Sequence, residues 1–273
     1  MGHRSRNPAG RKLIVAEIGP CPRRMKKLEV FPVGGFPEVQ KGADIAATFL
    51  AAAKRSKLRL KDGDVVVIKQ KIVSKAEGRL VRLSEVKPGT RAKKLAEEQG
   101  KDPRLVELVL RESVRVVRAG HGVIITETKQ GLVCANSGVD RSNVKPGYAA
   151  LLPVDADASA RMIRKGIEAG TRKRVAVIVS DTFGRPWRKG QTDVAIGCSG
   201  MEPLLSYLGK TDRYGYELRV TEPAVADEIA GAAELATGKL TRIPAAVVRG
   251  AKYQRSESGA KSVAIEKEKD LFR

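Results

Sequence analysis

A short segment of the sequence places a carboxylate and a hydroxyl group directly after an apolar run. Residues 175–197 read VAVIVSDTFGRPWRKGQTDVAIG, so a predicted buried strand ends at Asp181 and Thr182. The cations that follow are Arg185, Arg188 and Lys189. Asp140 ends a second predicted strand, and carboxylate and hydroxyl oxygens at neighbouring strand ends suit Mg²⁺ or Mn²⁺. Because a metal beside cations is what phosphoryl transfer needs, the pattern predicts a site of that kind.

Each of these side chains also has a simpler interpretation. A single aspartate often caps a turn and binds nothing. The apolar run at 65–68 is followed by Lys69, Lys71 and Lys75. These lysines are alternatively the solvated end of a strand. Trp187 is better explained as a core or lid anchor than as a base-stacking residue, and His121 in AGHGV as a turn residue.

Several standard nucleotide and nucleophile motifs are absent from the sequence. The GKT at 209–211 lacks the glycine of a P-loop five residues earlier, where Leu204 stands, and no G-x-G-x-x-G occurs. With His3 and His121 as the two histidines, a serine-type triad is implausible. The cysteines are Cys21, Cys134 and Cys198. They form no C-x-x-C pair, which indicates a reduced, cytoplasmic compartment.

The composition is that of a basic globular protein. The 273 residues carry a net charge of +21 at pH 7, so anionic partners are expected. The cations are spread along the chain and aromatic residues make up 4%, which disfavours a nucleic-acid module. A generally basic, solvated surface explains the charge equally well. No apolar run reaches the roughly 20 residues of a membrane span, and the start has no secretory h-region.

Periodicity and turn residues predict a mixed α and β fold with one basic arm. We expect residues 1–26 to form a flexible arm. Strands are predicted at 26–33, 65–68, 114–120, 122–129, 132–140, 175–180, 217–223 and 243–250. Helices are predicted at 45–57, 89–100, 102–113, 157–170 and 223–238. Because strands and helices do not alternate strictly, the fold class is α+β with mixed sheets rather than a doubly wound sheet.

Finer features of these elements follow from residue type. Asp44 and Asp102 are predicted helix caps, and Lys129-Gln130-Gly131 a hairpin turn. The helix at 157–170 is expected to turn Met162, Ile163 and Ile167 inward. The last helix is expected to pack through Val225, Ile229, Ala232 and Ala236.

Six segments together resemble the GTP-dependent coenzyme F420-0:gamma-glutamyl ligases. They are QKIVSKAEGR, NSGVDRSNV, VIVSDTFGRPWRKGQTDVAIG, TDRYGYEL, VADEIAGAAEL and IPAAVVRG. Their number, order and spacing make the resemblance strong, and it runs from about residue 28 to residue 250. It implies a ligase domain at 27–252, built of two intertwined subdomains, with a tail at 253–273, and a homodimer.

The resemblance also implies a reaction and its site residues. GTP would phosphorylate the carboxylate of F420-0, and L-glutamate would attack the acyl phosphate, with further γ-linked glutamates added in later rounds. Asp140 and Asp181 would bind one divalent ion, Mg²⁺ or Mn²⁺, and Thr182 a second, with K⁺ a further candidate. The implied GTP-binding residues are Phe36, Pro37, Glu38, Val39, Gln70, Lys71, Lys75, Asn143, Thr237, Gly238, Lys239, Leu240, Thr241, Arg242 and Ile243.

One position departs from the family pattern. Where relatives are expected to offer a carboxylate or carboxamide to the second metal, this sequence has Lys239. Two other functions stay open: a nucleotide-dependent ligase of the same fold that glutamylates another carboxylate, and a basic nucleic-acid-binding protein. A steep salt dependence of binding to random oligonucleotides would indicate the second.

Overall fold

The computed structural model describes residues 27–271, so the predicted arm at 1–26 lies outside the described residues. The main sheet of this part has five strands in the order β1-β10-β2-β8-β9. They are β1 (Glu29–Val33), β2 (Val65–Lys69), β8 (Ala176–Arg185), β9 (Arg188–Ser199) and β10 (Ala245–Arg249). β2 and β8 run parallel, and the other neighbours pair antiparallel. The strands predicted to begin near residues 26, 65, 175 and 243 are therefore confirmed.

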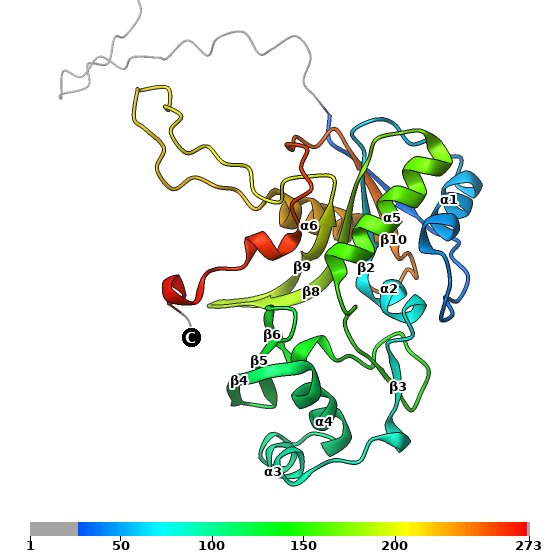
Figure 1. Cartoon of the computed structure of the whole chain (residues 1–273), viewed down its shortest axis with the longest axis vertical. Coiled ribbons are helices and arrows are strands. Elements are labelled where there is room, and N and C mark those ends of the chain that lie inside the picture. Colours follow the sequence, from blue (N-terminus) through cyan, green and yellow to red (C-terminus); the bar gives the residue numbers. More distant parts are fainter. Residues whose placement is uncertain (1–26, 272–273) are drawn as a thin grey trace, which may run out of the picture.

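Alternate residues of the central strands face opposite layers of helices. Val66 and Val177 pack on one side of the sheet with α1 (Ile45–Arg55) and α5 (Ala156–Thr171). Val65 and Ile178 pack on the other side with α6 (Val225–Thr237). Figure 1 shows the sheet between these helices. Because side chains alternate along a strand, this pattern also fixes which face each polar residue of β8 occupies.

Asp44 and Asp102 cap their helices as predicted. The carboxylate of Asp44 accepts from the backbone N–H of Ala47, and that of Asp102 from the N–H of Arg104. On α5, Ile163 and Ile167 are buried as predicted.

Two details of the helix faces differ from the prediction. Met162 is 66% exposed, so the expectation that it points inward is wrong; α5 buries alanines there instead. On α6, Val225 and Ile229 are buried as predicted. The rest of the α6 stripe consists of Ala226, Ala230, Ala233 and Thr237. Ala232 and Ala236 are only partly buried, because the stripe follows i+4 and i+3 steps from Ala226.

A smaller part of the molecule lies below the main sheet in Figure 1. It contains a two-stranded and a three-stranded antiparallel sheet and two helices. The elements are β3 (Leu80–Arg82), α3 (Thr90–Gln99), α4 (Pro103–Glu112), β4 (Ser113–Gly120), β5 (Val123–Thr128), β6 (Val133–Ala135) and β7 (Tyr148–Ala150). Both predicted helices and the predicted β-rich region are confirmed. With the main sheet, they make the α+β class with mixed sheets.

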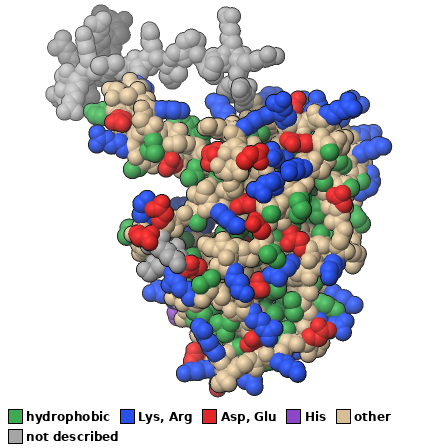
Figure 2. Space-filling view, in the orientation of Figure 1, with side chains coloured by type: hydrophobic (Ala, Val, Ile, Leu, Met, Phe, Trp, Pro, Cys, Tyr) green, Lys and Arg blue, Asp and Glu red, His purple; other side chains and the backbone are tan. Residues whose placement is uncertain are grey.

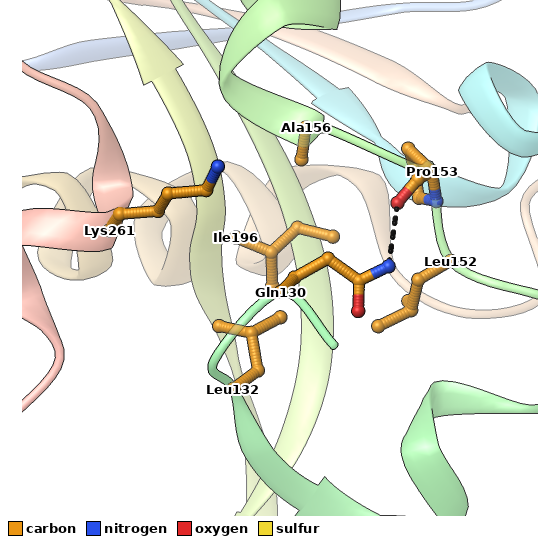
Figure 3. Close-up of a pocket in the computed structure, with 7 residues that line it drawn as sticks. All are labelled: Gln130, Leu132, Leu152, Pro153, Ala156, Ile196 and Lys261. Carbon is orange, nitrogen blue, oxygen red and sulfur yellow. Dashed lines mark hydrogen bonds between the residues drawn. The ribbon is translucent and has the colours of Figure 1, made fainter. Parts of the chain in front are cut away.

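The hairpin loop between β5 and β6 joins this smaller part to the main sheet. The side-chain amide of Gln130 donates to the carbonyl of Pro153, 3.3 Å away. Figure 3 shows Gln130 reaching across to Pro153, with Ile196 of β9 and Ala156 of α5 beside it. The cavity at this joint has a volume of about 10 Å³, so it has room for a water molecule and not for a substrate.

Two segments predicted as strand ends have other structures. Residues after the buried strand β2 form α2 (Gln70–Ala76) at once, with Lys69 as its extended N-cap. The strand predicted to end at Asp181 and Thr182 continues to Arg185, and β8 and β9 form a long hairpin. Trp187 lies at its tip with φ of 61° and 88% of its surface exposed, so a core position is wrong.

Two further strand predictions are wrong. Asp140 does not end β6, because the 3₁₀ turn Asn136–Gly138 intervenes; it forms an isolated bridge with Ala150 instead. The segment 217–223 is no strand. It belongs to an irregular ribbon that leaves the body between β9 and α6, stabilised by backbone bonds such as that from Gly209 to Leu218. The remaining 3₁₀ helices are Leu83–Glu85, Ala260–Val263 and Lys267–Lys269.

Candidate active site

The predicted site residues converge at one edge of the main sheet. At this level Lys69 pairs with Ser180, and Ile68 pairs with Ala245 at the start of β10. Val33, the last residue of β1, also pairs with Ala245, so the loop after β1 leaves from the same edge. The ends of β1 and β2, the middle of β8 and the turn before β10 are thus brought together.

A register shift precedes the polar part of β8. Val179 pairs with Gly197 and Ser180 with Ala195, so β9 carries one extra residue, Ile196, at this point. The N–H of Ala195 is bound by the carboxylate of Asp227 on α6, 2.8 Å away. Such bulges re-aim side chains next to functional sites.

Asp181 faces the α1 and α5 side of the sheet. Its neighbour in the strand at i+2, Phe183, packs against the core on that side. Within the described part of the chain no ion pair reaches Asp181. Burial raises its pKa to about 6, and the nearby carboxylates of Asp193 and Asp140 act in the same direction. The ionised form of this carboxylate is destabilised, so a bound cation would stabilise it.

Two groups act against burial at Asp181. The backbone N–H of Thr182 and the charge of Lys71 lower its pKa, but not enough to offset burial. The thiol of Cys134 on β6 is also close, because the charge of Asp181 helps burial to raise the pKa of this thiol to about 12. Cys134 is therefore a buried thiol that stays protonated at neutral pH.

Asp140 has a cationic partner, whereas no described residue forms an ion pair with Asp181. The ammonium of Lys71, on α2, donates to one of its oxygens. The backbone N–H and the hydroxyl of Ser142 donate to Asp140 over 2.8 Å and 2.5 Å. Although burial acts to raise the pKa of Asp140, these hydrogen bonds bring it below its usual value. The charge of Lys71 therefore acts on both Asp140 and Asp181.

Asp193 is a site residue that the sequence analysis missed. It pairs with Thr182 across the hairpin, and its side chain is completely buried. Lys69 donates to Oδ2, as does the hydroxyl of Ser180 over 3.1 Å; the hydroxyl of Thr182 donates to Oδ1 over 2.7 Å. Burial acts to raise its pKa, but Lys69 and Lys239 hold it below its usual value. The signal that could have found Asp193 is the β8–β9 hairpin. Because the sequence analysis ended the first strand at Thr182, it did not predict that Asp193 pairs with Thr182.

Lys239 approaches the same carboxylate from the turn after α6. Its ammonium lies 2.9 Å from Oδ1 of Asp193 and 2.5 Å from the hydroxyl oxygen of Thr182. It also lies 3.3 Å from a carboxylate oxygen of Glu234. Burial acts to lower the pKa of Lys239, but the bond to Asp193 raises it. Thr182, the predicted ligand of a second metal, thus contacts an ammonium group.

The predicted GTP-binding segments surround these carboxylates. Lys75 donates to Glu38 over 2.5 Å, which places the loop 36–39 beside α2. Gln70 is buried and accepts from the hydroxyl of Ser74 over 2.8 Å.

The predicted turn at 237–243 lies next to the same loop. The side chain of Ile243 lies against Gly34, just before residues 36–39. Leu240 is 95% exposed, and Asn143 is exposed in the loop that follows Asp140. The structure brings the predicted segments together, and their contacts with GTP stay a prediction.

The carboxylates fit a divalent ion that keeps other ligands. Across residues 27–271, no three side chains of His, Cys, Asp or Glu lie close enough together to form a metal-binding group. Asp140 and Asp181 supply two carboxylates on one side of β8. Mg²⁺ and Mn²⁺ suit such a pair, because they are commonly held by one or two carboxylates with water and substrate phosphate.

A larger cavity lies away from these residues. Its volume is about 410 Å³, and it lies between α5, the start of β8 and the segment 255–257. The start of β8 precedes Asp181 by five residues, so this cavity lies before the polar part of the strand.

The surface shows no single basic face in the view of Figure 2, where acidic side chains lie among the lysines and arginines. Within residues 27–271, no helix combines the length and apolar character needed to cross a bilayer.

Comparison with known proteins identifies relatives for nearly the whole described chain. The family described as F420-0:Gamma-glutamyl ligase matches residues 35–250. The coenzyme F420:L-glutamate ligase of Methanothermobacter thermautotrophicus is 44% identical over 249 residues, which are 90% of this chain and 99% of the relative. The protein of the same name from Methanopyrus kandleri is 44% identical over 251 residues, 90% of this chain and 98% of the relative. That of Methanocaldococcus jannaschii is 44% identical over 215 residues, 78% of this chain and 86% of the relative.

Proposed function

Because the chain belongs to the F420-0:gamma-glutamyl ligase family, we propose that it joins L-glutamate to coenzyme F420-0 through an amide bond in coenzyme F420 biosynthesis. The observation that carries this proposal is the match of the family over residues 35–250, which includes every residue assigned to the site. The enzyme is a ligase that forms carbon–nitrogen bonds. Further rounds add γ-linked glutamates.

GTP activates the acceptor carboxylate in this proposal. A carboxylate oxygen of F420-0 attacks the γ-phosphorus of GTP, the bond from that phosphorus to the β–γ bridging oxygen breaks, and GDP leaves. The amine of glutamate then attacks the carbonyl carbon of the acyl phosphate. The C–N bond forms, the C–O bond breaks, inorganic phosphate leaves and the nitrogen loses its proton to water. Both steps bring anions together, which requires fixed positive charge.

The lysines of α2 supply part of that charge. Lys71 pairs with Asp140, and Lys75 pairs with Glu38. We assign them to the GTP phosphates, to which their flexible side chains can turn, while the loop 36–39 and the turn 237–243 enclose the nucleotide. An ammonium group on a flexible stem can exchange one anionic partner for another, so these ion pairs are compatible with phosphate binding.

Asp140 and Asp181 are assigned to a divalent ion, Mg²⁺ or Mn²⁺. When bound, such an ion neutralises phosphate charge and orients the reacting oxygens. The support for this assignment is the state of Asp181, a carboxylate that is destabilised by burial and has no ammonium partner within the described residues. We further propose a homodimer located in the cytoplasm; light scattering coupled to size exclusion tests the dimer.

The test is a ligation assay read by mass. The full chain is incubated with F420-0, Mn²⁺ and glutamate, with either GTP or ATP. The expected product is F420-0 extended by glutamate, formed faster with GTP, and hydroxylamine in place of glutamate should give a hydroxamate by trapping the acyl phosphate. Absence of extended product with F420-0, together with glutamate-dependent GTP hydrolysis on another carboxylate, would instead support a ligase of the same fold with a different acceptor.

A further inference from the structure

The face of β8 opposite Asp181 carries a cluster whose charges already cancel. Ser180 and Thr182 alternate with Asp181 along the strand, so they face α6, and both donate to Asp193. The charged members of this cluster are Lys69, Asp193, Glu234 and Lys239. Two carboxylates and two ammonium groups leave no formal charge to attract another cation.

Both carboxylate oxygens of Asp193 are engaged. Lys69 binds Oδ2, and Lys239 binds Oδ1 at 2.9 Å together with the hydroxyl of Thr182. The Thr182 hydroxyl accepts from Lys239 at 2.5 Å, so its lone pairs also face the ammonium. A divalent ion here would add two positive charges beside two ammonium groups. The side chain of Asp193 is fully buried and that of Lys69 is 20% exposed, so repulsion from Lys69 is weakly screened, while Lys239 reaches the cluster from the surface.

The turn that carries Lys239 is fixed by its own backbone bonds. The N–H of Gly238 donates to the carbonyl of Glu234 over 2.7 Å, and its φ of 60° closes the helix. The hydroxyl of Thr241 donates to the carbonyl of Thr237. Because both ends of this short turn are held, the backbone of Lys239 is fixed, and its ammonium reaches Oδ1 of Asp193.

We propose that the ammonium of Lys239 takes the place of a second divalent ion at Thr182 and Asp193, so that this enzyme binds one divalent ion per chain, at Asp140 and Asp181. This inference rests on the metal use in the proposed function and narrows it. Lys239 is then a positioning residue: it holds Thr182 and the β8–β9 hairpin as a bridging ion would, without exchange with solvent.

The experiment counts Mn²⁺ by equilibrium dialysis of the full chain with saturating non-hydrolysable GTP analogue. Wild type should bind one Mn²⁺ per chain. Lys239→Glu, which leaves the cluster with three carboxylates and one lysine, should bind two. The matched control Lys165→Glu, at an exposed position on α5, changes the net charge equally and should stay at one. Electron paramagnetic resonance should show spin coupling between neighbouring Mn²⁺ ions in Lys239→Glu, and not in wild type or Lys165→Glu.

Lys239→Gln is a second variant that tests the inference if Lys239→Glu does not fold. It removes the ammonium without adding a carboxylate, and its Mn²⁺ count should rise above one at millimolar Mn²⁺. Two ions in wild type, or one ion in every folded Lys239 variant, would overturn the inference and leave the proposed ligase function intact. A wild-type protein that binds no Mn²⁺ would overturn the metal assignment as well, whereas the ligation assay tests the ligase function separately.

Discussion

The two faces of β8 hold carboxylates in opposite states. On the α6 face, Asp193 is completely buried and accepts from two lysines and two hydroxyl groups, which keeps its pKa low. On the other face, Asp181 has no lysine or arginine partner within the described residues, and burial raises its pKa to about 6. Asp181 on β8 and Asp193 on β9 therefore lie on opposite faces of one hairpin, one without an ammonium partner and the other with two.

This difference indicates what each face does. A carboxylate with all its hydrogen bonds made contributes to a fixed structure, because removing one partner leaves another group buried and unpaired. A buried carboxylate without a partner destabilises the ligand-free protein and gains most from a bound cation. We therefore assign the structural role to Asp193 and the ion-binding role to Asp181.

The largest expected effect comes from Asp181→Asn. Asparagine keeps the size of the side chain but removes the charge that holds the ion. Ligation should slow by at least about 10³, equivalent to about 4 kcal/mol, with the fold intact by circular dichroism. If Asp181 only shapes the hairpin, activity should stay near normal, and turnover close to wild type at saturating Mn²⁺ would contradict the assignment.

Asp193→Asn should act on stability instead. It leaves Lys69 without its counter-charge in a buried position, which typically costs about 3 kcal/mol. Urea unfolding of the metal-free protein should show this loss, in contrast to Asp181→Asn. An Asp193→Asn protein as stable as wild type would show that the two faces do not differ as described.

The pH dependence sharpens the contrast at Asp181. Because its pKa is raised in the folded protein, ionisation of this group removes stability as the pH rises from about 4 to about 6. In the presence of chelator, Asp181→Asn should therefore be more stable than wild type at pH 7.5, by on the order of 1 kcal/mol, and the gain should shrink at pH 5. An equal gain at both pH values would mean that burial of the charge is not the cause.

Deletion of residues 1–26 should have the smallest effect. The arm lacks periodic apolar residues to dock, and the contacts described for the site come from residues 34–243. The value of kcat/KM should stay within about tenfold of wild type, or 1.4 kcal/mol. A greater loss, with the remaining chain still folded, would assign the arm to the site.

Much of the fold could be predicted because local signals agree with the tertiary packing. The apolar run at 65–68 is a strand buried on both faces, and Asp44 and Asp102 cap their helices. The secondary-structure predictions failed where polar residues outnumber the apolar residues that pack. Lys71 and Lys75 lie on the helix α2 and not on a strand end. The helix packs through the buried side chain of Val73, but the lysines around this residue make the segment look like a solvated strand end in the sequence.

The candidate site was predictable in part for the same reason. Asp140, Asp181 and Thr182 stand out because carboxylates and hydroxyls after apolar runs suggest metal ligands. Asp193 became recognisable only through the pairing of β8 with β9, a contact that no local pattern specifies. The division of the site into two faces follows from strand alternation, which applies only once the strand is known to continue past Thr182.

One measurement tests the division of roles most directly: anomalous diffraction at the manganese edge from crystals grown with Mn²⁺ and a non-hydrolysable GTP analogue. We expect one manganese peak per chain, between Asp140 and Asp181, with the ammonium of Lys239 still on Asp193. A peak at Thr182 and Asp193 with Lys239 displaced, or no peak beside Asp181, would contradict it.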